Sequence, residues 1–253
     1  MSVRSRDFVV CAALLLASFL CAPMAGADSP RPGIEPRVDT LLRHMSTYLT
    51  DASEFSFRTE VNYDQVLESG QKILYGRHAE ISMRRPDRLH VLVNGDLVNE
   101  RIWYNGKTFI LMDSWDHEYV TVEAPPRIDE ALDFMARKYG IASPVSDVLY
   151  SDVYAILTEN VTTGVYIGHP VVRSVPTHHL AFTQKNIDWQ LWIEDGANPV
   201  PRKVVITYKN VVGSPQFIVW LSSWNFAPRF ADSLFDFLPP DGAKQVDIRP
   251  VDQ

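Results

Sequence analysis

The stretch that decides the fold is residues 176–226, PTHHLAFTQKNIDWQLWIEDGANPVPRKVVITYKNVVGSPQFIVWLSSWNF. It is rich in aromatic and β-branched residues, which favour strands. Asp-Gly, Asn-Pro and Gly-Ser-Pro sequences, which favour turns, divide it into segments. We therefore predict four consecutive antiparallel strands, at 177–185, 187–194, 200–209 and 216–226.

Alternation within one of these segments predicts how its side chains are shared between the two faces of a sheet. Trp189, Leu191 and Ile193 point to one side and Trp192 to the other, because successive strand residues alternate. For any single aromatic residue, ordinary core packing is the simpler interpretation. The alternative is a curved apolar sheet that its helices cover incompletely, which leaves a cavity for an apolar ligand.

The same period of two recurs upstream. Apolar residues alternate with polar ones over 55–63 and 73–83, which is typical of an antiparallel sheet with one covered face. The pattern predicts further strands at 88–94, 98–104, 107–113 and 117–123, with Asn94-Gly95 and Asn105-Gly106 as two-residue hairpin turns, and a hairpin over 161–175. About ten to eleven strands result, and an antiparallel sheet of that length curls into a barrel or half-barrel.

Two segments show helical rather than strand spacing. Apolar residues between 38 and 49 recur at intervals of three and four, which predicts a helix that packs on the sheet. Pro125-Pro126 ends the upstream strands, and residues 127–158 again carry helical spacing. Because 127–158 lies between two runs of strands, it must cross or cap the sheet. The predicted fold class is mainly β (α+β).

The N-terminus has the features of a secretory signal peptide over residues 1–27. Arg4 and Arg6 precede an uncharged apolar run at 8–20, and Ala25-Gly26-Ala27 provides small residues for cleavage. A retained anchor helix is the alternative, but the apolar run is short and Pro23 interrupts it. The sequence thus predicts an exported chain with no stable membrane span after cleavage.

Composition limits the chemistry of the mature chain. Both cysteines, Cys11 and Cys21, lie in the signal segment, so no disulfide or thiolate metal site is expected. The formal net charge of −7 becomes −8 when Arg4, Arg6 and Asp7 are removed. This acidic balance argues against nucleic acid or an anionic membrane surface as a main partner. Residues 28–253 are predicted to form a single domain.

Motifs that carry catalysis or hold a metal are absent from the sequence. Of the seven histidines, only His178 and His179 are adjacent, and neighbours on a regular strand point to opposite faces, so they cannot bind one ion. There is no nucleophile elbow, zinc-protease helix or phosphate loop. Asp188, Glu194 and Asp195 are at strand ends, where solvated or turn-forming roles are the default. We expect no enzyme activity, no catalytic residue, no metal and no cofactor.

The densest basic cluster is Arg84-Arg85-Pro86-Asp87-Arg88. It has two interpretations, a solvated strand end with a turn at Pro86, or a turn that aims one guanidinium at the lid or at a ligand headgroup. Arginine suits the second role because it presents several donors in a fixed geometry. The residues alone leave both interpretations open.

Three motifs in this order resemble the periplasmic lipoprotein-carrier superfamily of LolA, LolB and their relatives. They are RRPDRL at 84–89, WYNGKT at 103–108 and LFDFLPPDGA at 234–243. The series HLAF, DWQLWIE, PRKVVITYK and PQF within 179–217 more closely resembles a family of predicted periplasmic proteins, domain of unknown function 2092. The resemblance implies an open, strongly curved antiparallel half-barrel, with residues 127–158 as a helical lid over an apolar cavity that receives acyl chains. It also implies that Arg85, in the Arg-Pro pair, bonds the lid and gates its opening.

These observations predict a periplasmic binding or carrier protein for a lipid, a lipidated protein or another apolar ligand. The alternative is an envelope protein-interaction or stress-sensor module with no transport role. The expected partners are a lipid or acyl chain, a lipoprotein or an envelope protein. The residues predicted to line the cavity are Phe57, Tyr75, Ile81, Leu89, Trp103, Trp189, Leu191, Val204 and Ile206.

Overall fold

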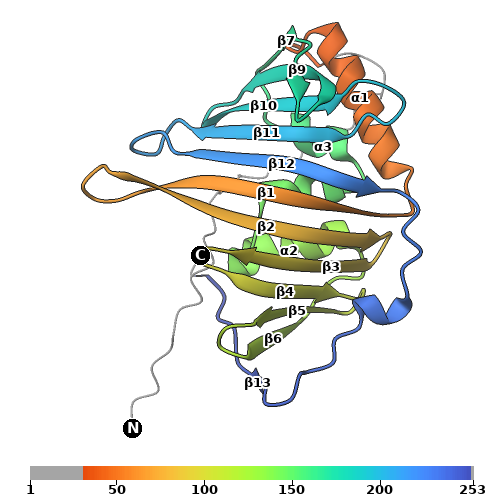
Figure 1. Ribbon diagram of the computed structural model, residues 1–253, viewed down its shortest axis with the longest axis vertical. Coiled ribbons are helices and arrows are strands. Elements are labelled where there is room, and N and C mark those ends of the chain that lie inside the picture. The colour runs from red at the N-terminus through yellow and green to blue at the C-terminus, as the bar shows by residue number, and fades with distance from the viewer. Residues whose placement is uncertain (1–30, 252–253) are drawn as a thin grey trace.

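The computed structural model describes residues 31–251, and the predicted signal peptide lies outside these residues. Their main feature is a 13-stranded sheet in the order β13-β6-β5-β4-β3-β2-β1-β12-β11-β10-β9-β7, with β8 paired to β9 (Figure 1). The strands are β1 (Glu54–Val66), β2 (Lys72–Arg84), β3 (Arg88–Gly95), β4 (Asn99–Tyr104), β5 (Thr108–Asp113), β6 (Glu118–Glu123), β7 (Thr163–Gly168), β8 (Val171–Val172), β9 (Val175–Thr183), β10 (Ile187–Glu194), β11 (Pro201–Tyr208), β12 (Gln216–Asn225) and β13 (Lys244–Gln245).

The sheet consists of two meanders joined in its middle. Strands β1 to β6 follow one another outward from the centre, and β12 brings the second meander back to pair antiparallel with β1. Among the strands of residues 31–251, only β13 pairs in parallel, with β6. The prediction of a mainly β, curved and open antiparallel sheet is confirmed. Strand β13 was not predicted, because it is two residues long and too short to leave a periodic signal. The hairpin predicted over 161–175 contains β7 and β8, but both strands pair with β9 and not with each other.

The helical segments are α1 (Pro36–Thr50), α2 (Ile128–Tyr139), the 3-10 turn η1 (Pro144–Leu149), α3 (Val153–Thr158) and a second 3-10 turn, η2 (Asp232–Phe235). Helix α1 begins with Pro36, whose missing amide hydrogen costs nothing in the first turn. Helix α2 ends at Gly140, which takes the left-handed conformation of a helix C-cap. Helices α2 and α3 lie against one face of the sheet (Figure 1).

We call the face covered by these helices the inner face and the opposite one the outer face. In the register of β1 and β2, Phe57 lies opposite Ile81 and Phe55 opposite Met83, and all four are buried. They belong to one core with apolar residues of α1, α2, η1 and α3. The sheet and the helices therefore form two layers around a single core.

The turn after β3 differs from the prediction. Strand β3 continues through Gly95, and the chain reverses at residues 96–98, where the Gly95 amide donates to the Val98 carbonyl at 2.8 Å. Glycine is needed at 95 for a different reason: a Cβ there would lie 2.4 Å from the Cβ of Arg77 on β2. The Asn94-Gly95 pair thus marks a close approach of two strands rather than a two-residue turn.

Candidate functional site

The inner face carries eight of the nine residues predicted to line a cavity. Cross-strand pairs share a face, and the pairs Tyr63–Tyr75, Phe57–Ile81, Trp189–Ile206 and Leu191–Val204 all lie on the helix-covered side. Leu89 joins them, opposite Met83. The eight are Phe57, Tyr75, Ile81, Leu89, Trp189, Leu191, Val204 and Ile206, of which Tyr75 and Val204 are half-buried and the others buried.

Trp103 was placed wrongly by the sequence prediction. It pairs with His90 on the outer face, while its neighbours Ile102 and Tyr104 point inward. The Trp103 ring lies 4.9 Å from that of Phe237, in the C-terminal segment that follows η2. The Phe237 ring also lies 4.9 Å from the Tyr119 ring on β6, so that segment covers outer-face residues of β4 and β6.

Arg85 ties the inner face to the lid. One terminal guanidinium nitrogen donates to the carbonyl oxygen of Leu149 and the other to that of Tyr150, both at 3.1 Å. These two carbonyls follow one another at the end of η1, so the fork of a single side chain holds the middle of the 127–158 segment. The third guanidinium nitrogen, Nε, is buried without a partner. Burial lowers the pKa of Arg85, and nearby Asp129 of α2 opposes this shift.

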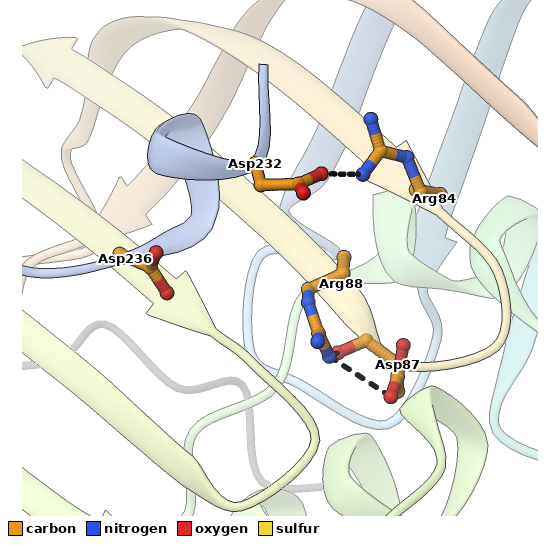
Figure 2. A pocket seen from close by; sticks show the side chains of 5 residues that line it. All are labelled: Arg84, Asp87, Arg88, Asp232 and Asp236. Atoms are coloured by element: carbon orange, nitrogen blue, oxygen red, sulfur yellow. Dashed lines mark hydrogen bonds and ion pairs between the residues drawn. The ribbon is translucent and has the colours of Figure 1, made fainter. Parts of the chain in front are cut away.

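The other arginines of this turn point elsewhere, as Figure 2 shows. Arg84 bonds Asp232 of η2 at 2.6 Å and Glu54 at 2.9 Å. Arg88 donates to the Asn105 carbonyl at 2.6 Å in the turn between β4 and β5. With Asp87 and Asp236, these side chains line a polar pocket of about 200 Å³. One turn therefore connects three separate parts of the fold, and among its arginines Arg85 is the one that bonds the lid.

Backbone and side-chain hydrogen bonds hold the two ends of the lid. At its start, the Ile128 amide donates to the Pro86 carbonyl at 2.9 Å. At its far end, the Tyr154 amide donates to the Ser46 hydroxyl of α1 at 2.9 Å, and the Tyr154 hydroxyl donates to the Asp39 carboxylate. Burial and the Asp39 bond raise the pKa of Tyr154 to about 12. Helix α3 is thus joined to α1, whereas the centre of the lid depends on Arg85.

Titratable groups also lie between the lid and the sheet. Burial raises the pKa of Asp147, in η1, to about 7. Asp147 is close enough to Tyr208 of β11 to contribute to that residue's raised pKa, after the larger effect of burial. On β4, burial and the neighbouring Asp113 carboxylate raise the pKa of Glu100 to about 7, while Arg77 opposes the shift. Ionisable groups, such as Asp147 of the lid and Glu100 of the inner face, therefore lie beside the apolar residues.

The raised pKa of Asp147 predicts that stability falls as pH rises. In the unfolded chain the Asp147 carboxyl has a pKa of about 3.9, so the folded state binds its proton more tightly. The resulting contribution to stability is fully present below a pH of about 4 and is lost as the pH rises through about 7. Asp147→Asn removes this titration. We expect the melting temperature of the native chain to fall further between pH 5 and pH 8 than that of the variant, by about 2–4 °C for each kcal/mol involved. Parallel pH dependences of the two proteins in calorimetry would contradict a raised pKa of Asp147.

The helices fill the inner face in this structure. Met135, Val148, Leu149 and Val153 of the lid are all buried in the same core as the sheet residues. A second polar groove, of about 480 Å³, is lined largely by outer-face residues such as Asn62, His78 and Asn94. An apolar ligand on the inner face would therefore have to displace the lid.

Comparison with known proteins adds the family to this geometry. A search of curated proteins returns no match. Among solved structures, the chain is similar to LprF from Mycobacterium bovis (14% identity, TM-score 0.48, covering 83% of this chain and 98% of that one). It is also similar to the lipoprotein LppX from Mycobacterium tuberculosis (14%, 0.45, 78% and 100%), and to a LolA superfamily protein from Nitrosomonas europaea (9%, 0.36, 79% and 97%). Likeness at this level carries no argument about a ligand.

The family model is more specific. It matches residues 38–249, nearly all of the described chain, and it is described as a predicted periplasmic protein family. This agrees with the periplasmic location and the family resemblance inferred from the sequence. No helix among residues 31–251 has the length and apolarity to cross a membrane. The chain belongs to the family of predicted periplasmic proteins known as DUF2092.

Proposed function

We propose that this protein binds a lipid, the acyl chain of a lipidated protein or another apolar ligand on the inner face of its sheet. The ligand displaces the lid from that face. One observation carries the proposal: a continuous apolar face is closed by a helical segment whose centre is attached through one arginine. The proposed role is binding or carriage rather than catalysis.

The energetics of exchange are favourable for a long chain. Each CH₂ group removed from water contributes about 0.8 kcal/mol, so roughly a dozen carbons contribute on the order of 10 kcal/mol before ordering costs. A ligand that displaces the lid exposes apolar lid residues such as Val148 and Leu149 to water, because these residues are buried in the closed state. Because both occupants bury apolar surface, the balance is decided by the polar contacts that hold the lid closed.

Arg85 is suited to that deciding role. Its two bonds to Leu149 and Tyr150 favour the closed lid, while its buried, unpaired Nε opposes it. An unpaired buried donor costs about 1–3 kcal/mol. Arg85 therefore stabilises the closed state by less than a fully bonded arginine would, so a ligand can displace the lid.

Native mass spectrometry tests the proposed function. Protein recovered from the periplasm without detergent should carry an adduct with the mass of a lipid or acyl chain. After solvent extraction, the same protein should bind a fluorescent long-chain fatty acid, and a short-chain acid of equal charge should not compete. A chain that arrives free of adducts and ignores the long-chain probe would refute the proposal. One stable protein partner, captured by cross-linking, would instead favour the sensor alternative.

A further inference from the structure

We propose that His169, His178 and Asp195 form a binding site for a divalent transition-metal ion, with Zn²⁺ as the best match. Each residue can offer one ligand atom, and these atoms lie within 4.8 Å of one another. The Asp195 carboxylate oxygens lie 2.8 Å from His169 Nε2 and 3.2 Å from His178 Nε2. The site lies at one end of the sheet, apart from Arg85 and the lid.

The separations suit a small cation. Zinc bonds of about 2.0–2.2 Å to nitrogen and oxygen put neighbouring ligand atoms of a tetrahedron about 3.4 Å apart. The two histidine–aspartate separations, 2.8 and 3.2 Å, are shorter than this value and involve different oxygens of Asp195, and all the ligand atoms lie within 4.8 Å of one another, so side-chain rotations would complete the geometry. Three protein ligands leave at least one position for water, as in open rather than closed zinc sites.

The backbone holds the three residues in place from separate segments. His169 follows β7, His178 lies within β9, and Asp195 follows β10. The Asp195 amide donates to the Pro176 carbonyl at 3.0 Å, and the Thr177 amide donates to the Pro170 carbonyl at 2.9 Å. These bonds fix the neighbours of all three side chains. Less of their conformational freedom is therefore lost when an ion binds.

The second nitrogen of His178 also has a partner. Its Nδ1 lies 3.2 Å from the Tyr166 hydroxyl on β7. If Nδ1 carries the proton and donates it to that oxygen, Nε2 keeps a free lone pair on the side of Asp195. Such an outer contact is typical of metal-binding histidines, because it fixes the ring and its tautomer. The Tyr166 ring is itself covered by the Arg37 guanidinium, 3.5 Å from the ring centre.

The ligand set selects the class of ion. Two imidazoles and one carboxylate are the donors of Zn²⁺ and of neighbouring ions such as Co²⁺, Ni²⁺ and Cu²⁺, whereas Ca²⁺ and Mg²⁺ prefer oxygen alone. The alternative is a histidine–aspartate cluster that binds no ion.

Equilibrium dialysis with Zn²⁺ separates these cases. The untagged mature chain should bind one ion, and Co²⁺ in its place should give the intense visible absorption of four-coordinate cobalt. His178→Gln and Asp195→Asn should each weaken Zn²⁺ binding by at least about tenfold, and Tyr166→Phe by about tenfold. His44→Gln, which changes an exposed histidine on α1, is the matched control and should leave affinity unchanged.

Folding of each variant is checked by its melting temperature without metal. Zn²⁺ should raise the melting temperature of the native chain and of the His44 variant, because it binds only the folded site. At the same Zn²⁺ concentration it should raise that of the Asp195 variant by less. Absence of Zn²⁺ binding at micromolar concentrations, or binding that the cluster variants leave intact, would overturn the proposal.

Discussion

Arg85→Met is expected to open the lid while leaving the sheet folded. Hydrogen bonds to a charged group contribute about 1.5–3 kcal/mol, and Arg85 makes two to adjacent carbonyls, at Leu149 and Tyr150. The unpaired Nε offsets part of this, so we expect a net loss of about 2 kcal/mol from the closed state, a rise of about 30-fold in the open population. Methionine keeps much of the apolar stem, which limits the loss of packing.

Hydrogen exchange measured by mass spectrometry reads this change segment by segment. The protection factors of amides in peptides from 127–158 should fall by about 30-fold, whereas those of amides in β1 and β2 should not change. The same variant should bind the long-chain probe up to about 30-fold more tightly, because a larger fraction of the protein already has the lid open.

Arg84→Met is the matched control for Arg85. It removes a guanidinium from the adjacent residue, whose bonds go to Glu54, Asp232 and the Phe230 carbonyl instead of the lid. We expect reduced protection in the segment around η2 and none of the lid effect. Equal exchange of the lid in both variants would show that Arg85 has no special hold on it.

Phe57→Ala is expected to cost about 3–5 kcal/mol of folding stability, the usual range for removing a buried phenylalanine. Phe57 is 1% exposed and stacks on Trp224 with ring centres 4.3 Å apart. Such a loss lowers the melting temperature by about 10 °C. Thermal and urea unfolding measure it.

Arg58→Ala is the control on the same strand. Arg58 points to the outer face and its side chain is 62% exposed. Its ion-pair partner Glu80, 51% exposed, is also open to water. Exposed pairs contribute little, so the change should stay within about 0.5 kcal/mol. Similar costs at 57 and 58 would contradict the assignment of inner and outer faces.

Alternation along the strands predicted the inner face well, because a strand has a period of two and one face must be covered. Phe57, Ile81 and Leu191 could be assigned to one side from their own neighbours. Trp103 could not be assigned in this way, because the C-terminal segment covers the second face of β4. Apolar residues then occur at both odd and even positions of the strand. The distant Phe237 that covers Trp103 leaves no signal in the local pattern.

Contacts between distant segments were the hardest to foresee. Arg85 was singled out through a family resemblance, since the residues alone left a solvated turn equally open. Strand alternation correctly placed His178 and His179 on opposite faces, and His179 stacks on Trp192 on the outer side. Alternation gives no sign that His169 and Asp195 lie close to His178. Their approach to His178 depends on an irregular register between β7 and β9 and on the loop after β10.

Photo-cross-linking with a diazirine-labelled long-chain fatty acid tests the central claim most directly. The extracted protein is labelled, digested and mapped by mass spectrometry, with Arg85→Met in parallel. Binding on the inner face predicts adducts on residues such as Ile81, Leu191 and Ile206, with more labelling in the Arg85 variant. Labels confined to outer-face residues such as Trp103 and Trp192, or no labelling that unlabelled fatty acid can displace, would contradict it.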